Sequence, residues 1–224
     1  MKFYLDLCTF AIMIRKLTVT CCFTFCLIAK ILASPIDSVF VHVPSDILSV
    51  LDMDARLDMI DLYNYNMKAE AYNIYGGKSE MTQKTDSMFS ISLTESSRWD
   101  LALLPQSADT IFAVIYTILS PAESSRIVLY DADWQPLAYQ FQLPEIEKFF
   151  REPYPFSPER MEILKQDLKM CSVSLSFSPQ TRALIAKVST TNAPEDDLAD
   201  LKHLLFPLRY AWTGDTFQLS PSSE

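Results

Sequence analysis

Residues 89–103 read FSISLTESSRWDLAL, two short alternating segments on either side of a polar turn. The alternating apolar residues are Phe89, Ile91, Leu93, Trp99, Leu101 and Leu103. Successive side chains of a β-strand point to opposite faces of a sheet, so a period of two places all six on one face. The stretch therefore predicts an antiparallel hairpin with one apolar face.

Three further pairs of apolar segments flank short polar turns. The turns are SPAESS (120–125), SPQT (178–181) and Thr213–Asp215, and the neighbouring segments are apolar and mostly alternating. A chain of hairpins interrupted by helical runs predicts an α+β fold, with antiparallel β-sheet hairpins and helices packed on one face. The repeated order of helix and hairpin leaves open a division into two similar halves.

The segment before the first hairpin is predicted to be extended and then helical. Residues 39–43, VFVHV, are interpreted as a short strand. Apolar residues then recur at helical spacing, which predicts two short helices joined near residues 52–54, the first of them capped by Ser45. Two more helices are predicted to begin after Ser157 and at Pro194.

Residues 1–33 have the order of an export signal peptide. Arg15–Lys16 precede an apolar run that ends in small residues. A lysine in the middle of a membrane costs roughly 2.5–3.5 kcal/mol, so Lys30 within this run disfavours a permanent span. Met13 offers a second start, which leaves open whether residues 1–12 are an over-extended start.

The remaining chain, 34–224, is expected to form a single α+β domain with halves of about 36–144 and 145–220. A chain of this length can bury roughly 70% of its unfolded surface in a core. Cleavage of the signal implies an exported protein of the periplasm or cell envelope. Lipid anchoring at Cys26 is disfavoured, because the apolar LIAKILA would remain on the mature chain.

The charge balance is acidic, with 19 basic and 28 acidic residues and a net charge of −9. Loss of the predicted signal would lower the net charge to about −12. Such a chain repels phosphate backbones, so no nucleic-acid partner is expected. Cys171 is the only cysteine outside the N-terminal segment, and the mature chain cannot form an intrachain disulfide.

Catalytic and metal-binding motifs are absent from the sequence. There are two histidines, His42 and His203, and no G-x-S-x-G, H-E-x-x-H or C-x-x-C pattern. Helical spacing places His203 on an outer face, and alternation places Cys171 on the apolar face of its strand. A thiol in apolar surroundings is unreactive. We therefore predict no catalytic residues, no metal and no cofactor.

Asp131, Asp133 and Trp134 form the strongest candidate ligand site. Two carboxylates beside a flat aromatic ring are the groups that glycan chemistry uses, with one acid, one base or nucleophile, and a ring on which a sugar stacks. Residues two apart on one turn rarely face each other across a substrate, and aspartate is common in turns for its local hydrogen bonds. Both interpretations remain open.

A second aromatic cluster lies near Gly76–Gly77. Its members are Tyr63, Tyr65, Tyr72 and Tyr75. Tyrosines between a helix and a sheet usually pack with the hydroxyl at the rim, and this is the expectation here. The sequence GGKS in the same region lacks the first glycine of a phosphate-binding loop and is interpreted as a turn.

The motifs GGKS, LTESS, LLP and a DW-P turn follow one another in this order along the chain. Together they resemble an uncharacterised family of small exported Bacteroidetes proteins with a domain of unknown function. The resemblance implies a Gram-negative cell envelope. It implies no activity and no site residues.

Two hypotheses of function follow. The first is a non-enzymatic exported protein that binds a protein or glycan partner in the cell envelope. The alternative is a glycan-directed hydrolase that uses Asp131 and Asp133. The sequence favours the first, because its apolar and polar positions are explained by packing and no acid, base and nucleophile converge.

Overall fold

The computed structural model describes residues 35–106 and 110–220. A six-stranded antiparallel sheet forms its centre, and the spatial order of the strands follows the chain order from β1 to β6. The strands are β1 (Glu70–Tyr72), β2 (Lys78–Lys84), β3 (Met88–Thr94), β4 (Ser97–Pro105), β5 (Thr110–Ile118) and β6 (Ser124–Tyr130). The opening stretch is the β3–β4 hairpin, as predicted.

A second antiparallel sheet of four strands, ordered β10-β9-β8-β7, comes from the C-terminal part of the chain. Its strands are β7 (Ser172–Phe177), β8 (Leu184–Ser189), β9 (Leu208–Trp212) and β10 (Phe217–Leu219). The helices are α2 (Pro35–Val41), α3 (Met53–Asn64), α4 (Pro158–Asp167) and α5 (Leu198–Leu204), with short 3-10 helices η1 (Ile146–Phe149), η2 (Leu168–Met170) and η3 (Glu195–Asp197). The predicted α+β class of antiparallel hairpins and helices is confirmed.

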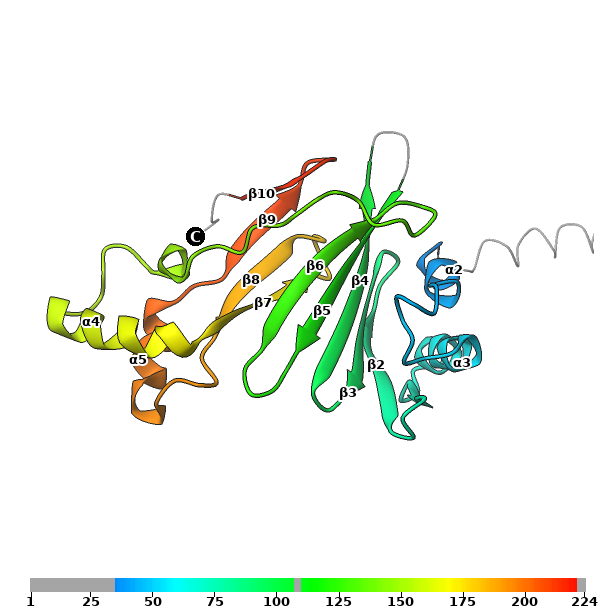
Figure 1. Cartoon of the computed structure of the whole chain (residues 1–224), viewed down its shortest axis with the longest axis horizontal. Helices are drawn as coiled ribbons and strands as arrows, with labels where there is room; N and C mark the ends of the chain where they lie inside the picture. Colours follow the sequence, from blue (N-terminus) through cyan, green and yellow to red (C-terminus); the bar gives the residue numbers. More distant parts are fainter. Residues whose placement is uncertain (1–34, 107–109, 221–224) are drawn as a thin grey trace, which may run out of the picture.

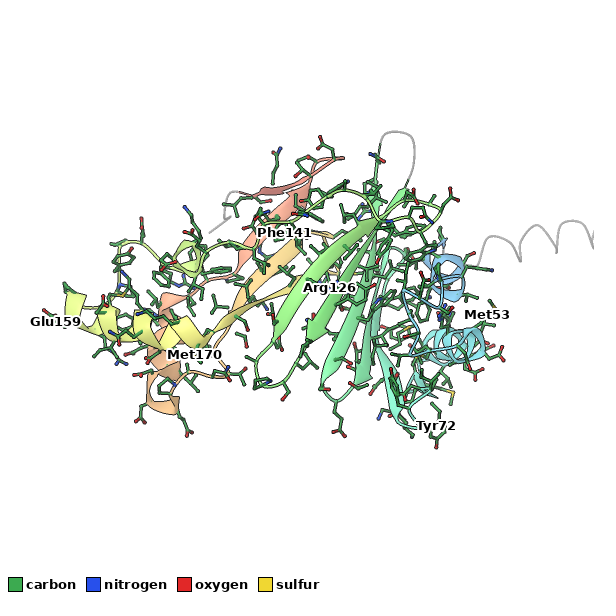
Figure 2. All side chains as sticks on the ribbon, viewed as in Figure 1. Met53, Tyr72, Arg126, Phe141, Glu159 and Met170 are labelled. Atoms are coloured by element: carbon green, nitrogen blue, oxygen red, sulfur yellow. The ribbon has the colours of Figure 1, made fainter. Side chains whose placement is uncertain are left out.

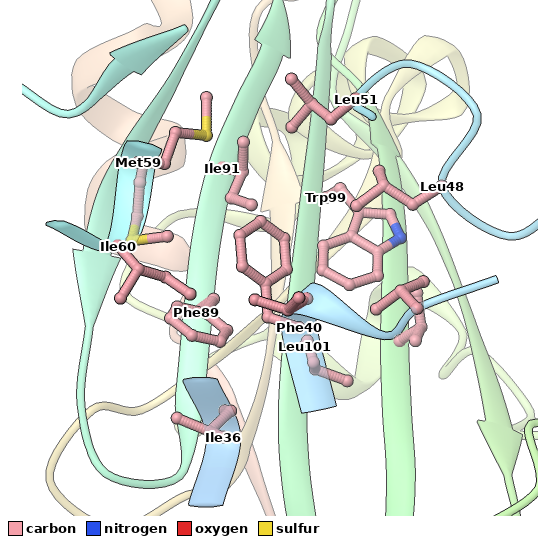
Figure 3. Packing of buried hydrophobic residues seen from close by; sticks show 14 of the residues in the cluster. Ile36, Phe40, Leu48, Leu51, Met59, Ile60, Phe89, Ile91, Trp99 and Leu101 are labelled. Carbon is pink, nitrogen blue, oxygen red and sulfur yellow. The ribbon is translucent and has the colours of Figure 1, made fainter. Parts of the chain in front are cut away.

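The elements form successive layers (Figure 1). Helices α2 and α3 cover one face of the six-stranded sheet, and the four-stranded sheet lies against its other face. Phe40 of α2 packs on Phe89 and Trp99, and all three side chains are fully buried (Figure 3). Helices α4 and α5 pack on each other in a separate apolar cluster beside the second sheet.

Polar side chains join the two sheets across their interface. Arg98 of β4 donates to the Leu175 carbonyl of β7 at 3.2 Å and pairs with Asp100 at 3.2 Å. Ser125 of β6 accepts the Leu175 N–H at 3.0 Å. Because β7 is an edge strand, these side chains satisfy backbone groups that would otherwise have no partner in the sheet.

The prediction of a strand at residues 39–43 is wrong, and so is the first of the two predicted helices. Residues 35–41 form α2, and residues 44–51 form turns without a Ser45-capped helix. In residues 41–51 the buried guanidinium of Arg56 on α3 donates to the carbonyls of Val41, Val43, Leu48 and Leu51. These hydrogen bonds satisfy the carbonyls of a segment that is not helical.

The second predicted helix is confirmed as α3, and Asp52 caps it by accepting the Ala55 N–H at 2.8 Å. Ser157 caps α4 with Pro158 at its start, also as predicted. The predicted signal at residues 1–33 lies outside the described residues. The domain boundaries at 34–224, with halves of about 36–144 and 145–220, stay a prediction.

Candidate functional site

The candidate residues Asp131, Asp133 and Trp134 lie on the turn that follows β6. The Asp131 carboxylate accepts the backbone N–H of Asp133 at 3.0 Å and of Gln135 at 2.8 Å. Both bonds lie within the turn and fix its shape. One Asp131 oxygen is therefore used locally, while the Asp133 side chain is exposed.

Trp134 folds back from the turn onto the six-stranded sheet. Its ring lies 4.6 Å from the ring of Phe112 on β5 and 5.7 Å from that of Tyr130 on β6, measured between centroids. Phe112 and Tyr130 are paired directly across the two strands. Trp134 has a φ of 59°, a left-handed conformation that is uncommon for a large side chain, and this backbone places the indole over the pair.

Two further side chains continue this aromatic surface along β5 and β6. Tyr116 and Arg126 form a directly opposed pair on the same face as Phe112 and Tyr130. The Arg126 guanidinium carbon lies 4.6 Å from the centre of the Tyr116 ring, a cation–π distance. The Tyr116 and Tyr130 hydroxyl oxygens are 3.3 Å apart. We call Phe112, Tyr116, Arg126, Tyr130 and Trp134 the aromatic strip.

The aromatic strip is open to solvent at its two ends. Trp134 and Tyr116 are partly exposed and Arg126 is exposed, whereas Phe112 and Tyr130 are buried between them. The strip shares the sheet face on which α2 and α3 pack, and Figure 2 shows Arg126 on β6, away from these two helices. Since β6 is an edge strand, a ligand could reach these groups from the side.

Burial keeps the Tyr116 hydroxyl of the strip neutral. Burial raises the pKa of Tyr116 well above its ordinary value, and the neighbouring Tyr130 hydroxyl adds to this rise. At neutral pH Tyr116 is therefore a hydroxyl that can both donate and accept a hydrogen bond. The strip offers flat rings, one cation and neutral polar edges.

The structure thus brings Asp131, Asp133 and Trp134 together with four residues that sequence reasoning missed. Phe112, Tyr116, Arg126 and Tyr130 are ordinary members of two predicted strands. The signal that could have found them is the register of the β5–β6 hairpin, because pairing across the SPAESS turn sets Tyr116 against Arg126 and Phe112 against Tyr130. The assignment of Asp131, Asp133 and Trp134 to ligand binding stays a prediction.

The remaining titratable candidates lie apart from the strip. His42 is exposed and its Nδ1 donates to the Ser38 carbonyl at 2.8 Å. His203 is exposed on α5 and meets the Phe156 ring edge-on at 5.9 Å. Cys171 precedes β7 and is half-buried against the α4–α5 cluster, where burial raises the pKa of its thiol.

Metal binding and membrane spans can be judged over the part of the chain that the structure describes. Within residues 35–106 and 110–220, no three His, Cys, Asp or Glu side chains are arranged to hold a metal ion. In that part of the chain no helix is both long and apolar enough to cross a membrane.

Comparison with known proteins gives a family for the chain. Residues 28–217 match the family model described as a protein of unknown function (DUF3256). The chain belongs to this family. The predicted resemblance to a family with a domain of unknown function is therefore confirmed. That the protein is exported and comes from a Bacteroidetes species remains a prediction.

A solved structure has the same fold. It is described as the structure of a domain of an uncharacterized protein from Porphyromonas gingivalis W83, and it is 20% identical to this chain with a TM-score of 0.67. The similarity covers 84% of this chain and 99% of that one. At this identity it supports the fold alone. Among curated proteins, none matches this chain.

Proposed function

We propose that the chain is an exported, non-enzymatic protein of the bacterial cell envelope that binds a glycan on the aromatic strip. The observation that carries the proposal is the row formed by Trp134, Tyr116 and the Arg126 guanidinium stacked on Tyr116. Export is supported by the order of residues 1–33, which is that of a signal peptide.

The chemistry of the strip suits a sugar. The apolar face of a pyranose ring packs on an aromatic ring, and its hydroxyl groups need donors and acceptors at the ring edge. Trp134 supplies one flat surface, with the exposed Asp133 next to it in the turn as an acceptor. Tyr116 supplies a second ring, with the Arg126 guanidinium stacked on it as a donor. These groups sit on paired strands or on a turn fixed by hydrogen bonds, so little ordering is needed on binding.

The net charge favours a neutral glycan over an acidic one. The chain carries −9, and loss of the predicted signal would make it more negative. A surface of this sign repels anionic polymers at long range. Arg126 is the one cation of the aromatic strip on a chain of negative net charge, and we expect it to donate hydrogen bonds to sugar hydroxyl groups.

The alternative function is a glycan hydrolase that uses Asp131 and Asp133. A hydrolase needs one carboxyl group as acid and a second as base or nucleophile, both facing the scissile bond. Asp131 already accepts two backbone N–H groups within the turn, and this local role favours binding without hydrolysis.

Affinity electrophoresis through gels that contain defined neutral or acidic polysaccharides tests the proposal. Wild-type protein should be retarded by at least one neutral polysaccharide, and both Arg126→Ala and Trp134→Ala should lose this retardation. Arg209→Ala is the matched control, since Arg209 is an exposed arginine on β9, outside the strip. Equal retardation of wild type and the two strip variants would contradict a role for the strip.

A second measurement separates binding from hydrolysis. Reducing ends are counted after incubation of the protein with the retarding polysaccharide. We expect no release above a blank, and no change for the double variant Asp131→Asn with Asp133→Asn. Release that the double variant abolishes would establish the hydrolase instead.

A further inference from the structure

Five large apolar side chains are exposed within one short segment between α3 and β2. They are Tyr65 (78% exposed), Met67 (59%), Tyr72 (73%), Ile74 (61%) and Tyr75 (71%). The expectation that the tyrosines pack between helix and sheet is wrong for all but Tyr63, which is partly buried against the core. We call these five residues the β1-edge patch.

The patch surrounds an edge strand whose outward backbone is open at Tyr72, while the Ile74 N–H donates to the Val50 carbonyl at 3.2 Å and the Glu70 N–H to the Lys68 carbonyl at 3.0 Å. β1 is the outermost strand of the six-stranded sheet and pairs with β2 alone. Two hydrogen bonds show which residues of this segment face β2. The Met81 N–H donates to the Ala69 carbonyl and the Asn73 N–H donates to the Gly77 carbonyl, each at 2.9 Å. Pairing alternates along an antiparallel ladder, so the backbone groups of Tyr72 point away from β2.

Charges beside the patch cancel one another. Glu70 pairs with Lys68 at 2.5 Å and with Lys78 at 3.0 Å, and Lys78 also lies 5.8 Å from the centre of the Tyr72 ring. Glu80 lies 3.8 Å from Lys68. Two lysines and two glutamates make this region neutral, although the whole chain carries −9. A second copy of the chain would therefore meet less repulsion here than over an average part of the acidic surface.

The apolar area is close to what a stable dimer needs. Three tyrosines that are more than 70% exposed offer about 450 Å² in all, and Met67 and Ile74 add about 200 Å². A standard interface buries about 800 Å² on each partner. Backbone pairing along β1 would supply the remainder together with main-chain hydrogen bonds.

We propose that two copies of the chain associate through β1 and the β1-edge patch, forming a continuous antiparallel sheet across a two-fold axis. With the axis at Ala71, Glu70 lies opposite Tyr72 of the second copy, and no like charges face each other. An axis at Glu70 would instead set two carboxylates opposite. The inference is independent of the aromatic strip, which lies on β5, β6 and the turn after β6.

Sedimentation equilibrium of the full chain tests this association. The mass should rise to twice that of the monomer between about 1 and 100 µM protein, a range typical of reversible dimers. Tyr72→Ala with Tyr75→Ala should raise the dimer dissociation constant at least about tenfold. Met170→Ala is the control, because Met170 is 73% exposed but lies at the other end of the molecule (Figure 2).

Two variants test the strand pairing itself. Tyr72→Pro removes the outward N–H as well as the ring, and should weaken the dimer further than Tyr72→Ala, since an edge strand tolerates proline. In the proposed register the two Ala71 Cα atoms are about 4.5 Å apart, so Ala71→Cys should form a disulfide with the same position of a second copy. Peptide mapping identifies that link whatever other cysteines are present.

Three results would overturn the proposal. The first is a wild-type protein that stays monomeric at the highest concentration. The second is a dimer that the tyrosine variants leave intact, or that Met170→Ala weakens equally. The third is an Ala71→Cys variant that dimerises but never links its two introduced thiols to each other under oxidising conditions. Glycan retardation by the strip is measured separately, and none of these results changes it.

Discussion

Replacement of Arg56 by methionine should destabilise the protein strongly. The Arg56 guanidinium is buried and makes five hydrogen bonds to four backbone carbonyls of residues 41–51. These carbonyls belong to Val41, Val43, Leu48 and Leu51. Burial lowers the pKa of Arg56, with nearby Asp52 opposing, but the ordinary arginine value is high enough that the group stays charged at neutral pH.

The magnitude follows from the carbonyl groups left behind. Each buried polar group without a partner costs about 1–3 kcal/mol, and some of the four would regain water as the segment loosens. At roughly 1 kcal/mol for each carbonyl, Arg56→Met should lower the free energy of unfolding by about 4 kcal/mol. Arg56→Lys offers three donors in place of five and should lose about half as much.

Urea denaturation followed by tryptophan fluorescence measures these changes. Arg209→Met is the control, since a substitution of an exposed arginine should shift the free energy of unfolding by less than about 0.5 kcal/mol. The reasoning fails if Arg56→Met stays within about 1 kcal/mol of wild type, because the segment would then hold its shape without the guanidinium.

Two further predictions concern pKa values. Burial raises the pKa of Asp100, and this effect outweighs the opposing ones of Arg98 and Ser90, so the native state holds this proton more firmly than the unfolded state. Relative to Asp100→Asn, the wild type should therefore be most stable below about pH 4 and should lose stability as the pH rises above that, as measured by urea denaturation at a series of pH values. A relative stability that grows with pH would refute this. Burial also raises the pKa of the Cys171 thiol, so a thiol reagent at pH 8 should modify Cys171 at least about tenfold more slowly in native than in urea-unfolded protein, with equal rates as the contrary result.

The hairpins could be predicted from the sequence because strand and turn signals there are local. Alternation in β3 and β4 and the polar turn between them are visible without any knowledge of the rest of the fold. The same holds for the Ser157 cap of α4, where side chain and backbone donor are three residues apart. Local patterns of this kind fixed the class and most of the element order.

The path of residues 41–51 could not be predicted, because a side chain from outside the segment binds its carbonyls. Helical spacing and the Ser45 cap are local signals for a helix. Arg56, however, donates hydrogen bonds to carbonyls of this segment that lie 5 to 15 residues before it in the sequence. The aromatic strip was missed for a similar reason. Trp134 was visible as a candidate, yet its contact with Phe112 depends on the register of two strands.

The tyrosine segment shows the limit of typical packing as a guide. Tyr65, Tyr72 and Tyr75 were expected to fill the space between helix and sheet. In the structure that space is occupied by smaller side chains, among them the buried Ala69 and the partly buried Ala71. The tyrosines therefore face solvent.

The strand order of the larger sheet bears on how the chain folds. From β1 to β6 each strand pairs with the next along the chain, so every pairing closes a short loop at a small entropic cost. The Leu175 backbone of β7 finds its partners on Arg98 of β4 and Ser125 of β6, two side chains that the six-stranded sheet brings together. We therefore expect the six-stranded sheet to form first and to serve as the surface on which the C-terminal sheet assembles.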